Sequence, residues 1–301
     1  MTLLISKVQY QRSEKGEFHD VAERSLADTI FLVLNYPWAT ERSLADIKLS
    51  CPSVTIENPI GTYLKIGPYF SGKFSLYYLD TNDKVYLKVI PTLEDAVSFV
   101  QAYFEQKGKL QGFEKYGFVV KPSTHFRTNP FEYTIGTRAI ITFFRFPIYM
   151  MAAILLMLGL SYLEHPGRFN LIAAAETMLW VFLLLWGPLI YLFFDYLLAD
   201  ENNYIQISRG HEEFVYGTID NKKTYSKQDI VRINAYGLRY QRSLWSECEV
   251  FIITFKNGEQ IKFTSLLISS GALIEKFHDR GIRNNKKFFA TSGSVPMIKL
   301  A

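Results

Sequence analysis

Two long stretches without a charged residue constrain the fold of this chain more than any other feature. They run from Phe146 to Leu163 and from Thr177 to Phe194, and each contains 18 residues. A helix needs roughly 20 predominantly apolar residues to cross the hydrocarbon core of a bilayer. The alternative is a pair of buried helices in a large soluble core, but such helices usually show charged stripes that these stretches lack. We therefore predict a transmembrane helical hairpin over residues 138–200.

The connection between the two stretches predicts the topology of the hairpin. Residues 164–168 form a short linker, so the two helices must be antiparallel and both chain termini must lie on one side of the membrane. Basic residues favour the cytoplasmic side. The turn holds only Arg168, beside Glu164, whereas four basic residues precede the hairpin: Lys121, Arg127, Arg138 and Arg145. We predict a two-pass protein of the bacterial cytoplasmic (inner) membrane with both termini cytoplasmic.

Residues 1–137 are predicted to form a cytoplasmic α+β domain. Apolar residues recur at helical spacing around residues 18–35. A second helix is expected to begin at a capping box formed by Thr92 and Asp95 and to end near Gly108. Four segments rich in Val, Ile, Tyr and Phe predict strands: Ser53–Glu57, Thr62–Ile66, Lys73–Leu79 and Lys84–Ile90. The simplest architecture is a sheet covered by the two helices.

Residues 201–301 are predicted to form a mainly-β domain with one terminal helix. Asn257-Gly258 lies between two alternating segments and is a strong hairpin signal. Ser269 or Ser270 can cap a helix that ends near Gly281, and the tail beyond Phe288 is expected to be disordered. The strands expected before this helix are Tyr204–Ser208, Glu213–Thr218, Lys223–Ser226, Ile230–Tyr236, Cys248–Phe255 and Glu259–Thr264. Short strands followed by one helix are typical of a small open barrel.

Several segments of this half resemble a known class of proteins. They are NNYIQIS after the second apolar stretch, YSKQDIVRI, FIITFKNGEQIKF and ISSGALIEKF. Over residues 138–280 the chain resembles bacterial membrane-hairpin proteins with a C-terminal pleckstrin-homology-like (PH-like) domain, which implies binding to lipid, peptide or protein without catalysis. More faintly, residues 57–106 are similar to immunity proteins of interbacterial toxin systems.

The sequence contains no recognisable catalytic or metal-binding motif. The five histidines do not show metal-ligand spacing, and the two cysteines, Cys51 and Cys248, have no nearby Cys or His partner. Neither a phosphate-binding loop nor a GxSxG or HExxH motif occurs. We predict a non-enzyme without a metal or cofactor, although distant residues could still assemble a site.

The net charge of +4 is concentrated in the C-terminal domain, because residues 1–137, 138–200 and 201–301 carry 0, −1 and +5. Four basic residues are candidates for contact with anionic lipid headgroups: Lys222, Lys223, Arg239 and Arg242. An ordinary solvated face is the alternative. Nucleic-acid binding is not expected, because the interleaving of basic and aromatic residues is too short.

Aromatic residues alternate along the predicted N-terminal strands. The candidates for an exposed partner-binding surface are Tyr63, Tyr69, Phe70, Tyr77 and Tyr78. A Tyr-rich core on both faces of the sheet is the alternative. The sequence thus predicts a non-catalytic membrane protein whose cytosolic domains bind a protein or lipid partner. The alternative function is that of an immunity protein that neutralises a cognate toxin at the membrane.

Overall fold

The computed structural model describes residues 2–43, 52–117, 121, 125–168, 170–237, 248–277 and 289–292. The chain divides into two compact units. Unit 1 contains Met1–Pro130 and the short segment Ser208–His211. Unit 2 contains Phe131–Ile207 and Glu212–Ala301.

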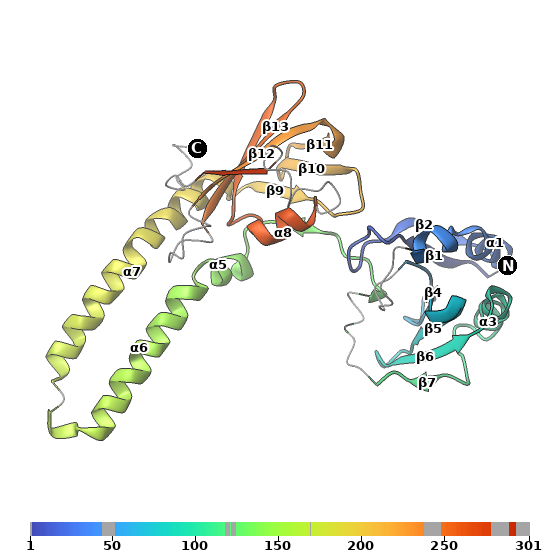
Figure 1. The fold of residues 1–301 in the computed structure, drawn as a ribbon, viewed down its shortest axis with the longest axis horizontal. Coiled ribbons are helices and arrows are strands. Elements are labelled where there is room, and N and C mark those ends of the chain that lie inside the picture. The colour runs from blue at the N-terminus through green and yellow to red at the C-terminus, as the bar shows by residue number, and fades with distance from the viewer. Residues whose placement is uncertain are drawn as a thin grey trace. The chain divides into compact units, whose positions relative to one another are not determined.

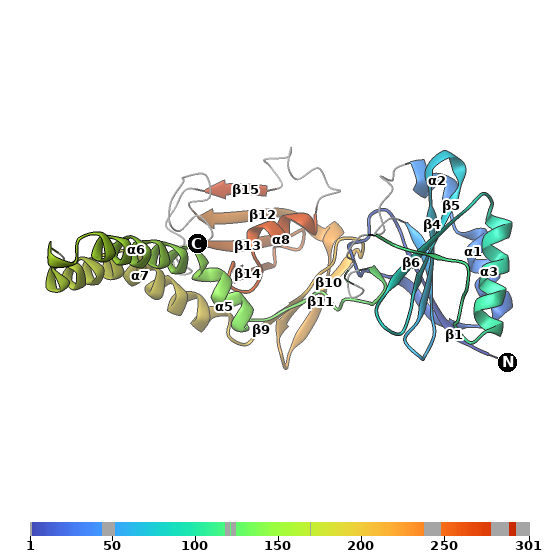
Figure 2. The same ribbon diagram turned by 90° about the horizontal axis from the view of Figure 1, so that it is seen from below.

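Unit 1 is an antiparallel sheet covered by helices. Its described elements are β1 (Leu4–Gln9), β2 (His19–Arg24), α1 (Leu26–Asn35), α2 (Trp38–Ser43), β3 (Ser53–Glu57), β4 (Tyr63–Pro68), the 3₁₀ turn η1 (Phe70–Gly72), β5 (Phe74–Leu79), β6 (Val85–Ile90), α3 (Leu93–Glu105) and β7 (Glu114–Lys115). Within the described residues the sheet has seven strands in the order β2-β1-β3-β4-β5-β6-β7. Helices α1 and α3 lie on the same side of this sheet (Figure 2).

Local sequence signals account for several of these elements. The predicted capping box starts α3, because the Thr92 hydroxyl accepts a hydrogen bond from the Asp95 N–H and the Asp95 carboxylate accepts one from the Thr92 N–H. The predicted β5–β6 hairpin is also confirmed. At its turn, the Asp80 carboxylate accepts hydrogen bonds from the backbone N–H groups of Asn82 and Lys84.

The predicted helix over residues 18–35 is wrong for residues 18–25. His19–Arg24 form β2, which pairs with β1, and the helix begins only at Leu26. The Ser25 hydroxyl accepts a hydrogen bond from the Asp28 N–H and caps this helix. The backbone groups of β2 are satisfied by strand pairing, which outweighs the helical spacing of the apolar side chains.

Unit 2 combines two sheets with a long helical hairpin. Its described elements are β8 (Glu132–Tyr133), α5 (Thr137–Phe143), α6 (Arg145–Glu164), the 3₁₀ turn η2 (Pro166–Arg168), α7 (Leu171–Asp200), β9 (Asn203–Gln206), β10 (Glu213–Thr218), β11 (Lys222–Ser226), the 3₁₀ turn η3 (Lys227–Asp229), β12 (Ile230–Gly237), β13 (Glu249–Phe255), β14 (Gln260–Thr264), α8 (Ser270–Glu275) and β15 (Phe289–Ser292). The strand orders are β11-β10-β9-β8 and β14-β13-β12-β15.

Side chains from both sheets form the core of unit 2. Ile205 and Phe214 come from the first sheet and Ile233 and Phe251 from the second, and Leu273 of α8 packs into the same cluster. The predicted helix cap is confirmed, because the Ser269 hydroxyl accepts a hydrogen bond from the Ala272 N–H.

The expectation of a disordered tail beyond Phe288 is wrong for its first residues. Phe289–Ser292 form β15, which pairs in parallel with β12. The physical reason is that the edge of β12 offers unpaired backbone groups that a short extended segment can satisfy. Residues 293–301 lie outside the described part of the chain.

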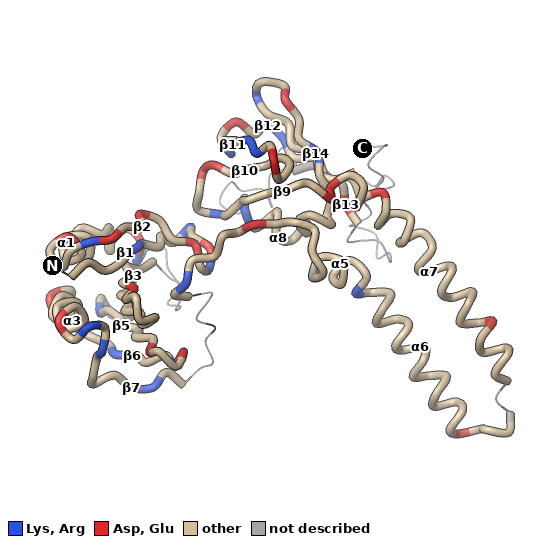
Figure 3. Tube along the Cα trace, turned by 180° about the vertical axis from the view of Figure 1, so that it is seen from behind, with Lys and Arg blue, Asp and Glu red and all other residues tan. Residues whose placement is uncertain are grey.

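Helices α6 and α7 are long, apolar and mostly exposed. They run side by side and antiparallel (Figure 1), and the tube in Figure 3 shows almost no charge along them. Both are long and apolar enough to cross a membrane. The 20 residues of α6 span about 30 Å, which matches the hydrocarbon thickness of a bilayer. Exposed side chains such as Leu156 and Leu184 cover their surface.

The hairpin is inserted within the strand order of unit 2. Strand β8 precedes α6 in the chain, yet it pairs with β9, which follows α7. The sequence-predicted boundary at residue 137 assigns Glu132 and Tyr133 to the N-terminal domain, whereas the structure places them in the sheet of unit 2. The hairpin therefore leaves this sheet from one strand and returns to the neighbouring strand.

Candidate functional site

The last third of α7 is part of the core of unit 2. Leu189, Leu192 and Tyr196 are buried in one cluster with Val250 and Leu266. Side chains nearer the start of the helix, including Leu171 and Leu184, are exposed. The helix thus has an exposed apolar segment that leads without a break into a segment packed on the β-sheets. This continuity fixes the direction in which the hairpin leaves unit 2.

A buried carboxylate secures the end of this helix. Asp200 is the final residue of α7 and is completely buried. Its Oδ2 atom accepts hydrogen bonds from the backbone N–H and the hydroxyl of Thr264, at 2.7 and 2.6 Å, and its Oδ1 atom accepts one from Asn203, at 2.7 Å. Hydrogen bonds to a buried charge are among the stronger ones in proteins, so this contact ties α7 to β14 and β9.

Two of the four residues predicted to contact lipid lie on β11. Lys222 is exposed, and its ammonium lies 3.8 Å from the centre of the Tyr204 ring, a cation–π contact. Lys223 donates to both carboxylate oxygens of Glu259 at 2.7 Å. The hydrogen bonds that Lys223 and Tyr225 donate to Glu259 hold the pKa of this carboxyl below its ordinary value. The acid therefore stays charged beside the lysine. Arg239 and Arg242 lie outside the described residues.

Most of the aromatic residues predicted to form an exposed partner surface are buried. Tyr63 and Tyr77 pack with Phe126 on one face of the sheet, and Tyr78 lies in the helix-covered core on the other face. The expected exposure is therefore wrong for these three residues, because segments after α3 cover the second face of the sheet. Tyr69 is half-buried and Phe70 is exposed, and their rings contact each other edge-on.

The structure also brings together residues of unit 1 that no sequence motif connects. Glu17 is buried, with a side chain that is 1% exposed, and its Oε1 atom accepts hydrogen bonds from the Ser208 hydroxyl and from the N–H groups of Gly210 and His211. Its Oε2 atom accepts from the N–H groups of Glu14 and Gly210. Burial raises the pKa of this carboxyl, but these hydrogen bonds outweigh burial and hold the pKa below its ordinary value.

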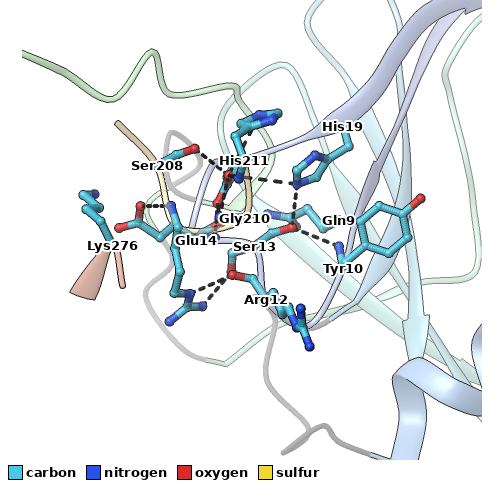
Figure 4. Close-up of polar contacts among 12 residues, drawn as sticks. Gln9, Tyr10, Arg12, Ser13, Glu14, His19, Ser208, Gly210, His211 and Lys276 are labelled. Carbon is cyan, nitrogen blue, oxygen red and sulfur yellow. Dashed lines mark hydrogen bonds and ion pairs between the residues drawn. The ribbon is translucent and has the colours of Figure 1, made fainter. Parts of the chain in front are cut away.

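Sequence reasoning missed this cluster because its members are separated by almost 200 residues. His19 lies two residues after Glu17, but His211 comes from the segment that follows β9. The His19 and His211 rings lie beside each other in Figure 4, with 4.3 Å between their centres. The absence of a metal-ligand spacing in the sequence therefore did not exclude a group of potential ligands assembled by the fold.

A second histidine environment gives a prediction about pH. The pKa of His125 is lowered to about 4. Burial of the ring is the main cause, and the positive charges of the nearby Lys65 and Lys15 contribute to the shift. The His125 Nδ1 atom has no hydrogen-bond partner among the described residues. The imidazole is thus neutral in the folded protein down to about pH 4, whereas in the unfolded chain it is protonated below about pH 6.5.

Unit 1 should therefore lose stability as the pH falls from about 6.5 to 4, since the unfolded state binds a proton that the folded state excludes. For a partly exposed ring we expect a loss of about 1–2 kcal/mol. His125→Gln should flatten this dependence. Hydrogen exchange of β4 and β5 in the full-length protein, corrected for intrinsic exchange rates, measures it. An unchanged pH slope in the variant would refute the assignment to His125.

Comparison with known proteins identifies one domain. Residues 132–276 match the family model of a pleckstrin-homology (PH) domain. This match covers just under half of the chain and begins at β8, so it includes both helices of the hairpin. It confirms the coarser prediction of a PH-like C-terminal domain. No curated protein and no solved structure matches the chain, and the similarity of residues 57–106 to immunity proteins stays a prediction.

Proposed function

We propose that this chain is a non-catalytic integral membrane protein of the bacterial cytoplasmic membrane whose PH-like domain binds a lipid or protein partner at the membrane surface. The observation that carries this proposal is the insertion of the apolar hairpin between the paired strands β8 and β9. A domain built around its own anchor is held at the bilayer and cannot diffuse away from it. The PH-like match supports binding, because such domains generally serve as interaction modules rather than catalysts.

The packing of α7 supports a short distance between the domain and the membrane. The buried residues at the end of α7 begin at Leu189, so about 18 residues from Leu171 remain for the bilayer, or about 27 Å of helix. This is close to the thickness of the hydrocarbon core. The PH-like domain then starts where the hydrocarbon ends, at the depth of the lipid headgroups.

The anionic-lipid form of this proposal has a direct test. A chain with Lys222, Lys223, Arg239 and Arg242 all replaced by glutamine should retain less anionic lipid than the wild type, because each basic residue near the surface contributes about 1 kcal/mol. Both proteins are purified in mild detergent from mixed anionic and zwitterionic lipid, and the bound lipids are quantified by mass spectrometry. Enrichment should also fall as the salt concentration rises.

A matched control variant also loses four basic residues, but at other positions in the C-terminal half of the chain. Lys256, Lys262, Arg232 and Lys286 can be replaced by glutamine for this purpose. Equal loss of anionic lipid in the control and the test variant would show a general charge effect. No enrichment of anionic lipid in the wild type would refute lipid binding and favour a protein partner, which co-purification from the same detergent extract would then identify.

A further inference from the structure

Three potential metal ligands converge in unit 1. Glu17 and His19 precede the residues that match the PH-domain model, whereas His211 lies within them. The Nε2 atoms of His19 and His211 lie 4.0 and 3.9 Å from Oε1 of Glu17, and all three atoms lie within 4.8 Å of one another. Two ligand atoms of a tetrahedral zinc ion, each at about 2.0–2.1 Å, are separated by about 3.4 Å. The two Glu17–His separations would shorten by about half an ångström, and the two histidine nitrogens would approach each other by up to about 1.4 Å, to reach a coordinating geometry.

A contact with Ser13 bears on which nitrogen of His19 carries the lone pair. The Ser13 hydroxyl accepts a hydrogen bond from the Tyr10 N–H, and its oxygen lies 3.1 Å from His19 Nε2. The Ser13 hydroxyl can donate its proton to Nε2 in the tautomer that carries the lone pair on that nitrogen, and a metal ion bound there would replace this hydrogen bond.

A glycine leaves space at the point where the ligands meet. A Cβ atom added to Gly210 would lie 3.0 Å from Glu17 Oε1 and 3.0 Å from His19 Nε2. Because Gly210 has no side chain, the space beside Glu17 Oε1 and His19 Nε2 is not filled by a Cβ atom; we call this space the cradle. His211, whose side chain is 50% exposed, leaves the cluster open to solvent, which provides an entry path and water for the remaining coordination positions.

From this arrangement we propose that unit 1 binds one divalent transition-metal ion of the Zn²⁺ type through Nε2 of His19 and Nε2 of His211. Oε1 of Glu17 already accepts three hydrogen bonds, so the carboxylate acts as a fixed negative charge beside the ion rather than as its main ligand. Imidazole nitrogens select Zn²⁺, Ni²⁺ and Cu²⁺ over Mg²⁺ and Ca²⁺, which prefer oxygen ligands.

The test measures Zn²⁺ binding by the full-length protein in detergent, purified with a histidine-free affinity tag. We expect one Zn²⁺ per chain, measured by competition with a chromogenic chelator, and no binding of Mg²⁺. His19→Gln and His211→Gln should each weaken Zn²⁺ binding by at least the roughly 10- to 100-fold that the loss of an outer-shell partner costs. Gly210→Ala should weaken it as well, because the added Cβ fills the cradle. The matched control is His165→Gln, which removes an exposed histidine from the hairpin turn and should leave Zn²⁺ binding unchanged.

Two further results separate metal binding from misfolding. Hydrogen exchange of β1 and β2 without metal should be the same in the wild type and the His19→Gln variant, whereas Zn²⁺ should slow exchange only in the wild type. If the double variant His19→Gln/His211→Gln binds Zn²⁺ as tightly as the wild type, or if the wild type binds none, the proposal is refuted. Its failure would leave the proposed function of the PH-like domain untouched, because the two assays measure different units.

Discussion

Replacing Asp200 with alanine should lower the free energy of unfolding of unit 2 by about 3 kcal/mol. The substitution leaves the Thr264 N–H and hydroxyl, both buried, without their acceptor. It also removes one of the two acceptors of the Asn203 amide, which keeps its hydrogen bond to the Ala199 carbonyl. For a unit of this size the change corresponds to a fall in melting temperature of about 6–12 °C. The end of α7 should then detach from β14 before the rest of the domain unfolds.

Thermal unfolding of the full-length protein in detergent measures the loss, and hydrogen exchange at β14 localises it. The matched control is Glu201→Ala, one residue further along the chain, where the side chain is exposed and a change within about 0.5 kcal/mol is expected. Asp200→Asn keeps one acceptor oxygen and should fall between the two. If the melting temperature of Asp200→Ala equals that of the Glu201→Ala control, the carboxylate does not hold the helix on the sheet.

Replacing Leu156 with arginine should prevent α6 from inserting into the membrane. Leu156 is exposed and lies near the middle of α6. An arginine at the centre of a transmembrane helix costs about 2.5–3.5 kcal/mol, which shifts the insertion equilibrium on the order of 100-fold. Failure of α6 to insert would leave the turn at Pro166 on the cytoplasmic side.

The position of the turn can be measured by labelling a single cysteine. Pro166→Cys is introduced into a chain that carries Cys51→Ser and Cys248→Ala, and intact cells are treated with a membrane-impermeant maleimide. The turn should be labelled from outside in this background, and Leu156→Arg should abolish the labelling. The control is Leu34→Arg, which places the same charge on an exposed position of α1. Absence of labelling in the background chain would contradict the predicted two-pass topology.

Features that depend on neighbouring residues were predictable from the sequence. The length of the two uncharged stretches, the capping box at Thr92 and Asp95 and the Asn257-Gly258 turn act over a few residues or over one helix, so the pattern alone specifies them. The six strands expected after residue 200 each correspond to a strand of unit 2, within one or two residues at their ends. The positive φ of Gly258 is consistent with the predicted turn between β13 and β14.

Other features depend on contacts between distant residues, and here only the tertiary structure decided. The pairing of β8 with β9 across the whole hairpin placed two residues in a different domain from the predicted one. Coverage of both faces of the first sheet buried Tyr63, Tyr77 and Tyr78, because the period of a strand shows which side chains share a face but not what covers that face. Glu17 and His19 come close to His211 only because the chain folds back over almost 200 residues, and no local sequence pattern indicates this contact. Local propensity and hydrophobic length thus determined the apolar hairpin and most elements, while long-range packing determined which side chains are buried and which come together.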